Sequence, residues 1–547
     1  MSQQEIAPSG LGPDRADNAA VTRSAFKVMA GGVLSVTCGL ASQIVVAAFF
    51  GAGADMDAFV TALVIPTFLA YLLIGPLSFV LIPAFIREET RGSGEEAWAL
   101  VGTFFWITAA VLGVMAIAGA LFPEHIIGLT APGFGPEKSR LASRMLTVLM
   151  FTVPLIGIGS LMRGLQSARG HFFWPSAAVG LGSLANVMIL LILRDRSGPM
   201  SLAWGNLASA MVMAGVPSCS ILRHGWKTTL SLNDPKLLEL GRLILPFVAL
   251  GVFTRSVSIF ERLFASALPD GSISYLGYAY KISLVFVLVL AESIASAVFP
   301  SMARAYARSG REGLVQQSAY GMRLSLVTVL PVWLILSALS VPLVSVLFER
   351  GAFTRADTLQ VSRIILIVLA GDLVLRMMNN IIMRTFYVLK DTLTFPLVSA
   401  AGILLYIPLG KLLAGRWGYV GLALAQPIKL AIVSLVVFSL MVKKSRPFPL
   451  KKLSRQSGLY LSISLISAVC AYLMTSLLAF LPEVIRLGLA LGVSAFVYLA
   501  LMFWRDREIA VALLEIAGLK TSRPWMRAFL LKYGIVNPGR ERAGDLD

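Results

Sequence analysis

Charged side chains inside a long apolar segment, residues 243–268, could bind an anion. Arg255, Ser258 and Arg262 are spaced i, i+3 and i+7, which places them on one face of a helix. Two guanidinium groups with a hydroxyl between them offer fixed positive charge and several hydrogen-bond donors, as a diphosphate requires. Glu261 is adjacent to Arg262 in the sequence, and we expect it to point away from Arg262.

The next apolar segment, residues 272–299, also contains ionisable residues. Lys281 and Glu292 are eleven residues apart. This separation is close to three helical turns, so both share a face, about 16 Å apart. We expect Lys281 to hold a diphosphate together with the two arginines, and Glu292 to line the same polar cavity.

A third apolar segment, residues 360–385, contains Asp372 and Arg376 at the i, i+4 spacing of an ion pair. The pair could line a transport cavity or serve an ion-coupling step, and a purely structural pair is an equal alternative. With Ser258, Glu261 and Glu292, these residues complete our predicted set of polar cavity or coupling groups.

Gly51, Gly53 and Asp57 lie in the string FFGAGADMDAF, between two apolar segments. We predict that this string acts as a gate. Asp57 is at the beginning of the second segment, where a helix N-cap explains it better than a substrate contact does.

The amino-acid composition indicates the class of protein to which these charged side chains belong. The chain has 547 residues, of which 57% are hydrophobic and only 14% are charged, and its mean hydropathy is +0.79. Soluble proteins have roughly a quarter charged residues, so this chain lacks the charge to cover a soluble surface. The net charge of +18 comes from short Lys/Arg clusters between apolar runs, which argues against nucleic-acid binding and for a membrane protein.

Apolar runs of about 20 residues, enough to cross a bilayer, occur fourteen times. We therefore predict an all-α polytopic membrane protein. The predicted spans are 26–50, 58–82, 98–122, 141–162, 174–193, 201–222, 243–268, 272–299, 321–347, 360–385, 394–413, 419–442, 458–480 and 484–503.

The loops between these spans give an orientation. Lys and Arg are concentrated in alternate loops, among them the loop assigned to Arg163 and Arg169, and this bias predicts that both termini are cytoplasmic. Residues 1–25 are polar and lack the features of a cleavable signal, so we expect a disordered cytoplasmic tail. Residues 504–547 mix apolar and basic side chains, as in a cytoplasmic helix lying on the membrane surface.

An internal repeat divides the chain. PEHIIGLTAPGF at 123–134 matches the spacing of PLVSVLFERGAF at 342–353, and the segment 163–175 matches 384–396. The offset of about 220 residues covers six spans, so both copies have one orientation. We predict two six-helix lobes, 26–222 and 243–442, with a site between them, and two extra helices in 458–503.

Enzyme and metal motifs are missing. The sequence has no GxxxxGK[ST], GxSxG, HExxH or CxxC string, and its three cysteines and three histidines are scattered. We therefore expect a protein that is not an enzyme, with no catalytic residues, no metal site and no cofactor.

Several ordered strings carry a family resemblance. They are FFGAGADMDAF at 49–59, LIPAF at 81–85, TAPGF at 130–134, LFERGAFTRADT at 347–358, FYVLKDTLTFP at 386–396 and GYVGLALA at 418–425. In this order and spacing the chain resembles the MurJ/MviN family of lipid II flippases, over about residues 26–503.

The resemblance implies the fold of the multidrug/oligosaccharidyl-lipid/polysaccharide exporters and alternating access in the bacterial cytoplasmic (inner) membrane. The implied substrate is a polyprenyl-diphosphate-linked glycan of peptidoglycan synthesis. The implied partners are this lipid-linked glycan, membrane lipids and the enzymes of envelope glycan synthesis. The coupling agent stays open between Na⁺, H⁺ and the membrane potential alone.

The chain departs from the family where the resemblance implies arginines in the first two helices. Val36 and Ser42 occupy the first helix, Ala70 and Tyr71 the second, and Lys281 stands in place of an arginine. These departures leave two alternatives: a flippase for an exopolysaccharide or O-antigen carrier, and an ion-coupled exporter of small amphipathic cations. The cationic set argues against the second alternative, since such an exporter needs an acidic cavity.

Overall fold

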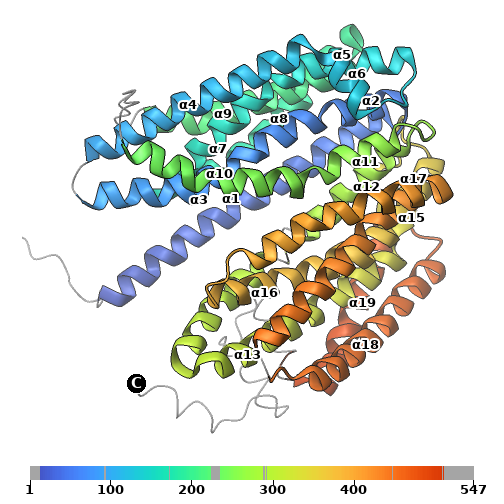
Figure 1. Ribbon diagram of the computed structural model, residues 1–547. Helices are drawn as coiled ribbons and strands as arrows, with labels where there is room; N and C mark the ends of the chain where they lie inside the picture. Colours follow the sequence, from blue (N-terminus) through green and yellow to red (C-terminus); the bar gives the residue numbers. More distant parts are fainter. Residues whose placement is uncertain are drawn as a thin grey trace, which may run out of the picture. The chain divides into compact units, whose positions relative to one another are not determined.

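The computed structural model describes residues 13–509 except 92–93, 170, 172, 223–234, 288–289, 291, 446 and 508. Within these ranges the regular structure is helical, with no strand. The helices are α1 (Pro13–Phe50), α2 (Ala54–Ala62), α3 (Val64–Thr90), α4 (Gly94–Leu121), α5 (Pro123–Thr130), α6 (Pro136–Met150), α7 (Thr152–Ala168), α8 (Phe173–Ser197), α9 (Met200–Leu222), α10 (Pro235–Arg255), α11 (Val257–Ala265), α12 (Ser272–Phe286), α13 (Glu292–Ala338), α14 (Ser340–Phe348), α15 (Arg355–Val368), the π-helical turn η2 (Leu369–Leu373), α16 (Val374–Val388), α17 (Thr394–Lys444), α18 (Leu450–Leu477) and α19 (Glu483–Arg505) (Figure 1).

Eleven helical segments of the described ranges are long and apolar enough to cross a membrane. The two longest helices, α13 and α17, have kinks at Gly310 and Gly418, where φ is +59° and +58°. A Cβ on Gly421 would lie 2.0 Å from the carbonyl oxygen of Leu413. Residues eight apart in a straight helix are about 12 Å apart, so the chain reverses at this kink, and α17 holds two of the predicted spans. The predicted all-α polytopic membrane fold is confirmed.

The first helix is longer than predicted. It begins at Pro13, so residues 13–25 are helical where we expected a disordered tail. Proline is favoured in the first turn of a helix, and the alanines that follow in DRADNAAV are strong helix formers, which accounts for the difference. The predicted surface helix of 504–547 lies almost wholly outside the described residues.

The chain divides into two compact units. Unit 1 comprises residues 1–277, 348–357 and 399–422, and unit 2 comprises 278–347, 358–398 and 423–547. These boundaries differ from the predicted lobes, because α10 and α11 belong to unit 1. Gly251 of α10 packs on α3 closely enough that a Cβ would lie 3.3 Å from Leu72.

Unit 1 has its core where α3, α4 and α7 meet. Leu81, Phe85, Trp98 and Leu165 are buried there, and α8 packs along both α1 and α9 (Figure 1). Arg169 follows α7, and its guanidinium lies 4.6 Å from the ring centroid of Trp98.

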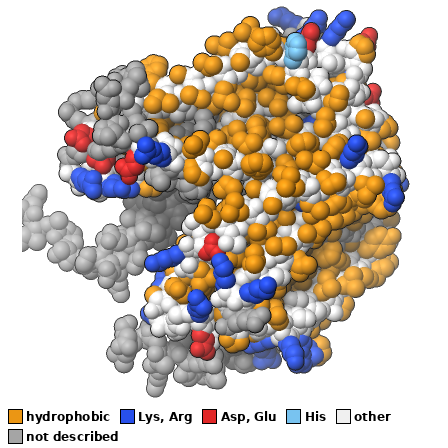
Figure 2. Space-filling view, viewed as in Figure 1, with side chains coloured by type: hydrophobic (Ala, Val, Ile, Leu, Met, Phe, Trp, Pro, Cys, Tyr) orange, Lys and Arg blue, Asp and Glu red, His pale blue; other side chains and the backbone are white. Residues whose placement is uncertain are grey.

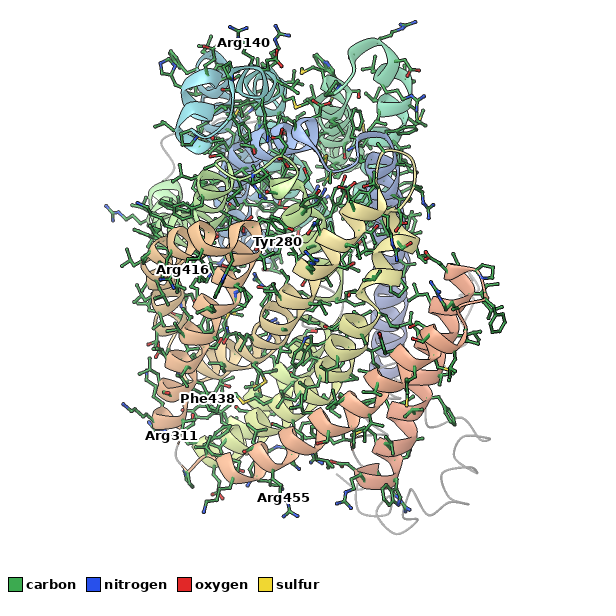
Figure 3. The ribbon with its side chains drawn as sticks, turned by 90° about the vertical axis from the view of Figure 1, so that its right-hand side faces the viewer. Arg140, Tyr280, Arg311, Arg416, Phe438 and Arg455 are labelled. Atoms are coloured by element: carbon green, nitrogen blue, oxygen red, sulfur yellow. The ribbon has the colours of Figure 1, made fainter. Side chains whose placement is uncertain are left out.

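Unit 2 packs α18 and α19 against α13. Small side chains, Ala468 and Ala471 of α18 and Ala490 of α19, allow these helices to approach Ile335 of α13 closely. Figure 3 shows Arg311 and Arg455 at the same end of unit 2, directed outward. Hydrophobic side chains cover most of the surface in view in Figure 2, as expected for a surface in contact with lipid.

Candidate functional site

The predicted stripe of Arg255, Ser258 and Arg262 is interrupted. The helix breaks at Ser256, so Arg255 ends α10 and Arg262 belongs to α11. Arg255 and Ser258 are exposed, whereas Arg262 is only 7% exposed. The Ser258 hydroxyl donates to the Arg255 carbonyl across the break, at 2.9 Å. The three residues therefore do not share one exposed face, because Arg262 is buried while Arg255 and Ser258 are exposed.

Glu261 pairs with Arg262, contrary to our expectation. Arg262 Nη1 lies 3.1 Å from Glu261 Oε1, and both side chains are more than nine-tenths buried. The long guanidinium arm reaches its sequence neighbour because the low-dielectric surroundings offer little water to either charge. Arg262 Nε and Nη1 have no well-aligned hydrogen-bond acceptor among the described residues, so the contact is an ion pair rather than a complete set of hydrogen bonds.

Arg255 lies against the ring of Tyr71. Its guanidinium carbon is 4.8 Å from the ring centroid, which is a cation–π contact. Tyr71 is 43% exposed, so the contact lies at a surface of unit 1. No ion pair with a carboxylate is found for Arg255 within the described part of the chain, and its role in binding a diphosphate stays a prediction.

Lys281 is in the part of α12 that belongs to unit 2. Its ammonium lies 5.8 Å from the ring centroid of Tyr278. The joint binding of one diphosphate by Arg255, Arg262 and Lys281 stays a prediction. Glu292 is the first residue of α13, and its side chain lies outside the described residues.

Asp372 and Arg376 form the ion pair that their spacing predicts. Arg376 Nε lies 2.6 Å from Asp372 Oδ2, and Asp372 is buried. Asp372 is in the π-helical turn η2, where a Cβ on Gly371 would lie 2.1 Å from Pro427. Single π-helical turns within α-helices are frequent at functional sites. The pair exists, and its part in transport stays a prediction.

Asp57 caps a different helix from the one we expected. The N-cap of α2 is Gly53, which makes no side-chain cap bond. Asp57 is 1% exposed and accepts from the backbone N–H of Gly271 at 2.8 Å and of Ser274 at 2.7 Å, at the beginning of α12. A carboxylate at the positive end of a helix dipole is stabilised, which explains this burial.

Lys138 completes this cluster and was not found from the sequence. Its ammonium lies 2.9 Å from Asp57 and 2.8 Å from Asp270. Nearby, the Tyr275 hydroxyl donates to Asp357 at 2.9 Å, and Asp357 accepts from the backbone N–H of Thr354, just before α15. Except for the local contact of Thr354 with Asp357, the partners in these contacts are separated by 80 or more residues. No rule of helical spacing could therefore have paired them.

Gly51 is at a close approach of two backbone segments of unit 1. Its φ is +58°, and a Cβ there would lie 2.4 Å from the carbonyl oxygen of Ala352. Gly351 has φ +63° and an equally close contact with the Ala48 carbonyl, while the Ala352 N–H donates to that carbonyl at 2.8 Å. Gly53 is extended and has open space beside it. Gly51 is thus required by geometry, and the gate function of Gly51, Gly53 and Asp57 stays a prediction.

Within the described ranges, no group of three His, Cys, Asp or Glu side chains is arranged to hold a metal ion. One position was assigned wrongly: Arg163, predicted in a loop, lies inside α7. Residues 165–167 contain neither glycine nor proline, the two residues that most disfavour a helix, so α7 continues to Ala168.

Comparisons with known proteins agree with this architecture. A family model described as "Lipid II flippase MurJ" matches residues 46–480. A relative from Bdellovibrio bacteriovorus, named "Probable lipid II flippase MurJ", is 26% identical over 449 residues, covering 80% of this chain and 84% of the relative. A relative of the same name from Aquifex aeolicus is 30% identical over 389 residues, covering 69% and 74%.

Solved structures show the same fold. A lipid II flippase MurJ in an inward closed conformation matches with a TM-score of 0.74 at 24% identity, covering 88% of this chain and 99% of that one. An inward-facing multidrug resistance transporter of the MATE family matches with a TM-score of 0.65 at 15% identity, covering 77% and 96%.

Proposed function

Because the chain belongs to the lipid II flippase MurJ family, we propose that it carries lipid II, or a closely similar polyprenyl-diphosphate-linked glycan, from the inner to the outer leaflet of the bacterial cytoplasmic membrane. The observation that carries the proposal is the family match over residues 46–480. The names of the matching family model and of the curated relatives favour lipid II as the substrate over an exopolysaccharide or O-antigen carrier. The likeness to MATE transporters, at 15% identity, concerns the fold alone.

The head group of such a substrate needs cations at bilayer depth. A diphosphate crossing a hydrocarbon core without partners would lose its hydration at a cost of many kcal/mol. Arg255 supports the proposal because it is exposed, borders a tyrosine ring and has no carboxylate pair among the described side chains. A charged side chain left exposed to lipid would be costly, so this surface fits a water-filled cavity.

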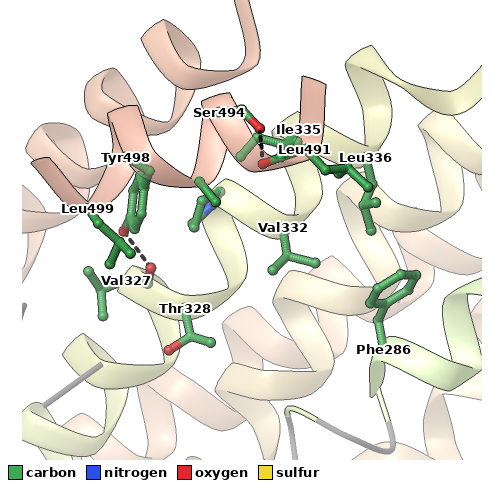
Figure 4. Close-up of a pocket in the computed structure, with 12 residues that line it drawn as sticks. Phe286, Val327, Thr328, Val332, Ile335, Leu336, Leu491, Ser494, Tyr498 and Leu499 are labelled. Atoms are coloured by element: carbon green, nitrogen blue, oxygen red, sulfur yellow. Dashed lines mark hydrogen bonds between the residues drawn. The ribbon is translucent and has the colours of Figure 1, made fainter. Parts of the chain in front are cut away.

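The polyprenyl tail needs an apolar surface, and unit 2 offers one. A groove of about 410 Å³ lies between α13 and α19, lined by apolar side chains that include Phe286, Val332 and Leu491 (Figure 4). The polar groups of its wall are occupied, since the Tyr498 hydroxyl donates to the Val327 carbonyl and Ser494 to the Leu491 carbonyl. We place an isoprenoid segment of the substrate in this groove.

Complementation tests the proposal directly. The gene is expressed in a bacterium depleted of its own lipid II flippase, and growth and lipid II in the outer leaflet are measured. Arg255→Gln serves as the loss-of-function variant, and Arg194→Gln as a matched control, because Arg194 also lies over an aromatic ring, 4.3 Å from the centroid of Phe49. Rescue by wild type and Arg194→Gln but not by Arg255→Gln supports the proposal. No rescue by a well-expressed wild type, with rescue of a polysaccharide-export strain, would establish the alternative substrate.

The orientation is a separate proposal. We infer from the Lys/Arg bias of the loops that both termini are cytoplasmic. Single cysteines introduced at Arg311 and at Asp270, in a variant lacking Cys38, Cys219 and Cys470, should label from opposite sides of the membrane with an impermeant maleimide. Labelling of Arg311→Cys from outside intact cells would reverse the orientation.

A further inference from the structure

Three polar side chains of unit 2 join α13, α18 and α19. Arg323 of α13 donates from Nε to the Tyr460 hydroxyl of α18 at 2.7 Å, and from Nη2 to Asp506, the C-cap of α19. The Tyr460 hydroxyl donates to the same carboxylate oxygen at 2.8 Å, which closes a ring of three hydrogen bonds. The side chains of Arg323 and Asp506 are only 15% and 13% exposed. Because charge-assisted hydrogen bonds shielded from water are strong, this triad holds three helices together at one point.

The groove between α13 and α19 begins one helical turn from the triad. Val327 follows Arg323 by four residues and lines the groove. Pro331, a further turn along α13, has no N–H, so the Val327 carbonyl lacks its usual partner within the helix. The Tyr498 hydroxyl of α19 donates to this carbonyl instead (Figure 4). The end of α19 is therefore attached to α13 twice, at the Val327 carbonyl and at the triad.

The other end of the groove is closed by apolar packing. Ala490 of α19 and Ile335 of α13 belong to one buried cluster. Val327 and Ile335 are eight residues apart, about 12 Å along a helix. Between these two positions the side chains leave the groove of about 410 Å³. The separation of α13 and α19 at the polar end depends on the triad and on Tyr498, and this separation sets the width of the groove.

Apolar contact alone would not fix α19 at the polar end. In a bilayer no hydrophobic force drives helices together, because lipid tails are as apolar as the side chains that they would replace. A lipid chain could therefore wedge between α13 and α19. The planar guanidinium of Arg323 fixes the directions of both its partners, so the triad gives the two helices a defined separation.

We propose that Arg323, Tyr460 and Asp506 are positioning residues for the prenyl chain of the substrate. The triad acts through α19, which it holds at the distance at which an isoprenoid segment contacts both walls of the groove. The inference rests on the proposed function, since it takes the groove as the place of the isoprenoid segment. Without the triad α19 moves away from α13, and the chain loses contact with one wall. Only ligands long enough to reach the groove are affected, which distinguishes positioning from general destabilisation.

The experiment compares two diphosphates with different prenyl chains, undecaprenyl diphosphate and the short dimethylallyl diphosphate. Binding to the purified full chain in detergent is measured by calorimetry, together with melting temperature. The variants are Tyr460→Phe, Asp506→Ala and the exchanged Arg323→Asp/Asp506→Arg. Arg486→Gln is the matched control, because the ion pair of Arg486 with Glu483 lies within α19.

Asp506→Ala removes two of the three hydrogen bonds of the triad. It should weaken the binding of undecaprenyl diphosphate at least about tenfold, which corresponds to a loss of about 55 Å² of apolar contact. The binding of dimethylallyl diphosphate should not change. Tyr460→Phe keeps the ion pair of Arg323 and Asp506 and should have a smaller effect in the same direction. The exchanged variant should regain affinity for the long chain, and Arg486→Gln should bind both ligands as wild type does.

Two results would overturn the positioning role. The first is unchanged affinity for undecaprenyl diphosphate in both Asp506→Ala and Tyr460→Phe. The second is equal weakening of both diphosphates, which would assign the triad to general stability. If Asp506→Ala does not fold, Tyr460→Phe decides between the same outcomes, because it keeps the ion pair and the aromatic ring. A wild type that binds both diphosphates equally well overturns the placement of the isoprenoid segment in the groove, and is thereby distinguishable from a failure of the triad.

Discussion

Two arginines of unit 1, only seven residues apart, have opposite surroundings. Arg262 is buried beside the carboxylate of Glu261, while Arg255 is exposed against Tyr71 without a carboxylate partner among the described residues. A buried pair is neutral as a unit and has little to offer an external ion. The comparison shows that two arginines close in sequence can have different surroundings, so charge alone does not identify a binding residue in a membrane helix.

The largest effect on transport is expected when Arg255 is neutralised. Arg255→Gln should reduce substrate flipping by about tenfold or more, because one charge-assisted contact is lost at about 1.5–3 kcal/mol. Flipping in proteoliposomes and melting temperature are measured side by side. If the variant flips at the wild-type rate, the difference between Arg255 and Arg262 has no functional meaning.

Breaking the buried pair should act on stability. Glu261→Gln leaves Arg262 buried without its carboxylate, which costs about 3–5 kcal/mol in typical proteins. Glu261→Gln/Arg262→Met removes both charges and should recover most of that loss. Thermal unfolding in detergent measures both variants. Full stability of Glu261→Gln with loss of flipping would instead make Glu261 a functional carboxylate.

The pair of Asp372 and Arg376 is intermediate between the buried pair of Arg262 and Glu261 and the exposed Arg255, since the side chain of Arg376 is 44% exposed. Asp372→Asn should cost about 1 kcal/mol because solvent screens the exposed partner. Exchanging the two residues should restore stability if the pair is structural. Flipping that falls in the neutral variant and returns partly in the exchanged one would show that the pair belongs to the transport path.

The smallest effect concerns pH. Lys444, by donating to Asp391 in the loop before α17, lowers the pKa of that carboxyl to about 2. A lowered folded-state pKa stabilises the protein at pH values above the usual aspartate range, and the stabilisation is lost as pH falls toward 2. Melting temperatures of wild type and Asp391→Asn should therefore differ by a constant amount between about pH 5 and 8 and converge below about pH 4. A difference that changes between pH 5 and 8 contradicts this assignment.

Much of the architecture could be predicted from local sequence. Apolar runs placed the membrane helices, because a bilayer requires about 20 apolar residues for each crossing. The i, i+4 rule found Asp372 and Arg376, because helical spacing alone brings those two side chains together. The predicted disorder of residues 13–25 was wrong because polarity was given more weight than the helix propensity of their alanines.

Contacts between distant segments were beyond such rules. Asp57 was recognised as a helix cap but assigned to the wrong helix, because its donors are more than 200 residues away at the beginning of α12. The helix break at Ser256 places Arg255 in α10 and Arg262 in α11. No glycine or proline occurs at Ser256, so the sequence did not predict this break. Arg163 was assigned to a loop, so its contact with the Met213 carbonyl of α9 could not be foreseen.

The sequence by itself determined that this chain is a helical membrane protein with cations at bilayer depth, because hydrophobic length and helical periodicity are local properties. Only the tertiary structure decided which cations are neutralised. Arg262 pairs with Glu261 within one buried turn, whereas Arg255 of α10 lies over the ring of Tyr71 of α3. An ion pair depends on burial and on neighbours from other helices, and these follow from packing rather than from spacing along the chain.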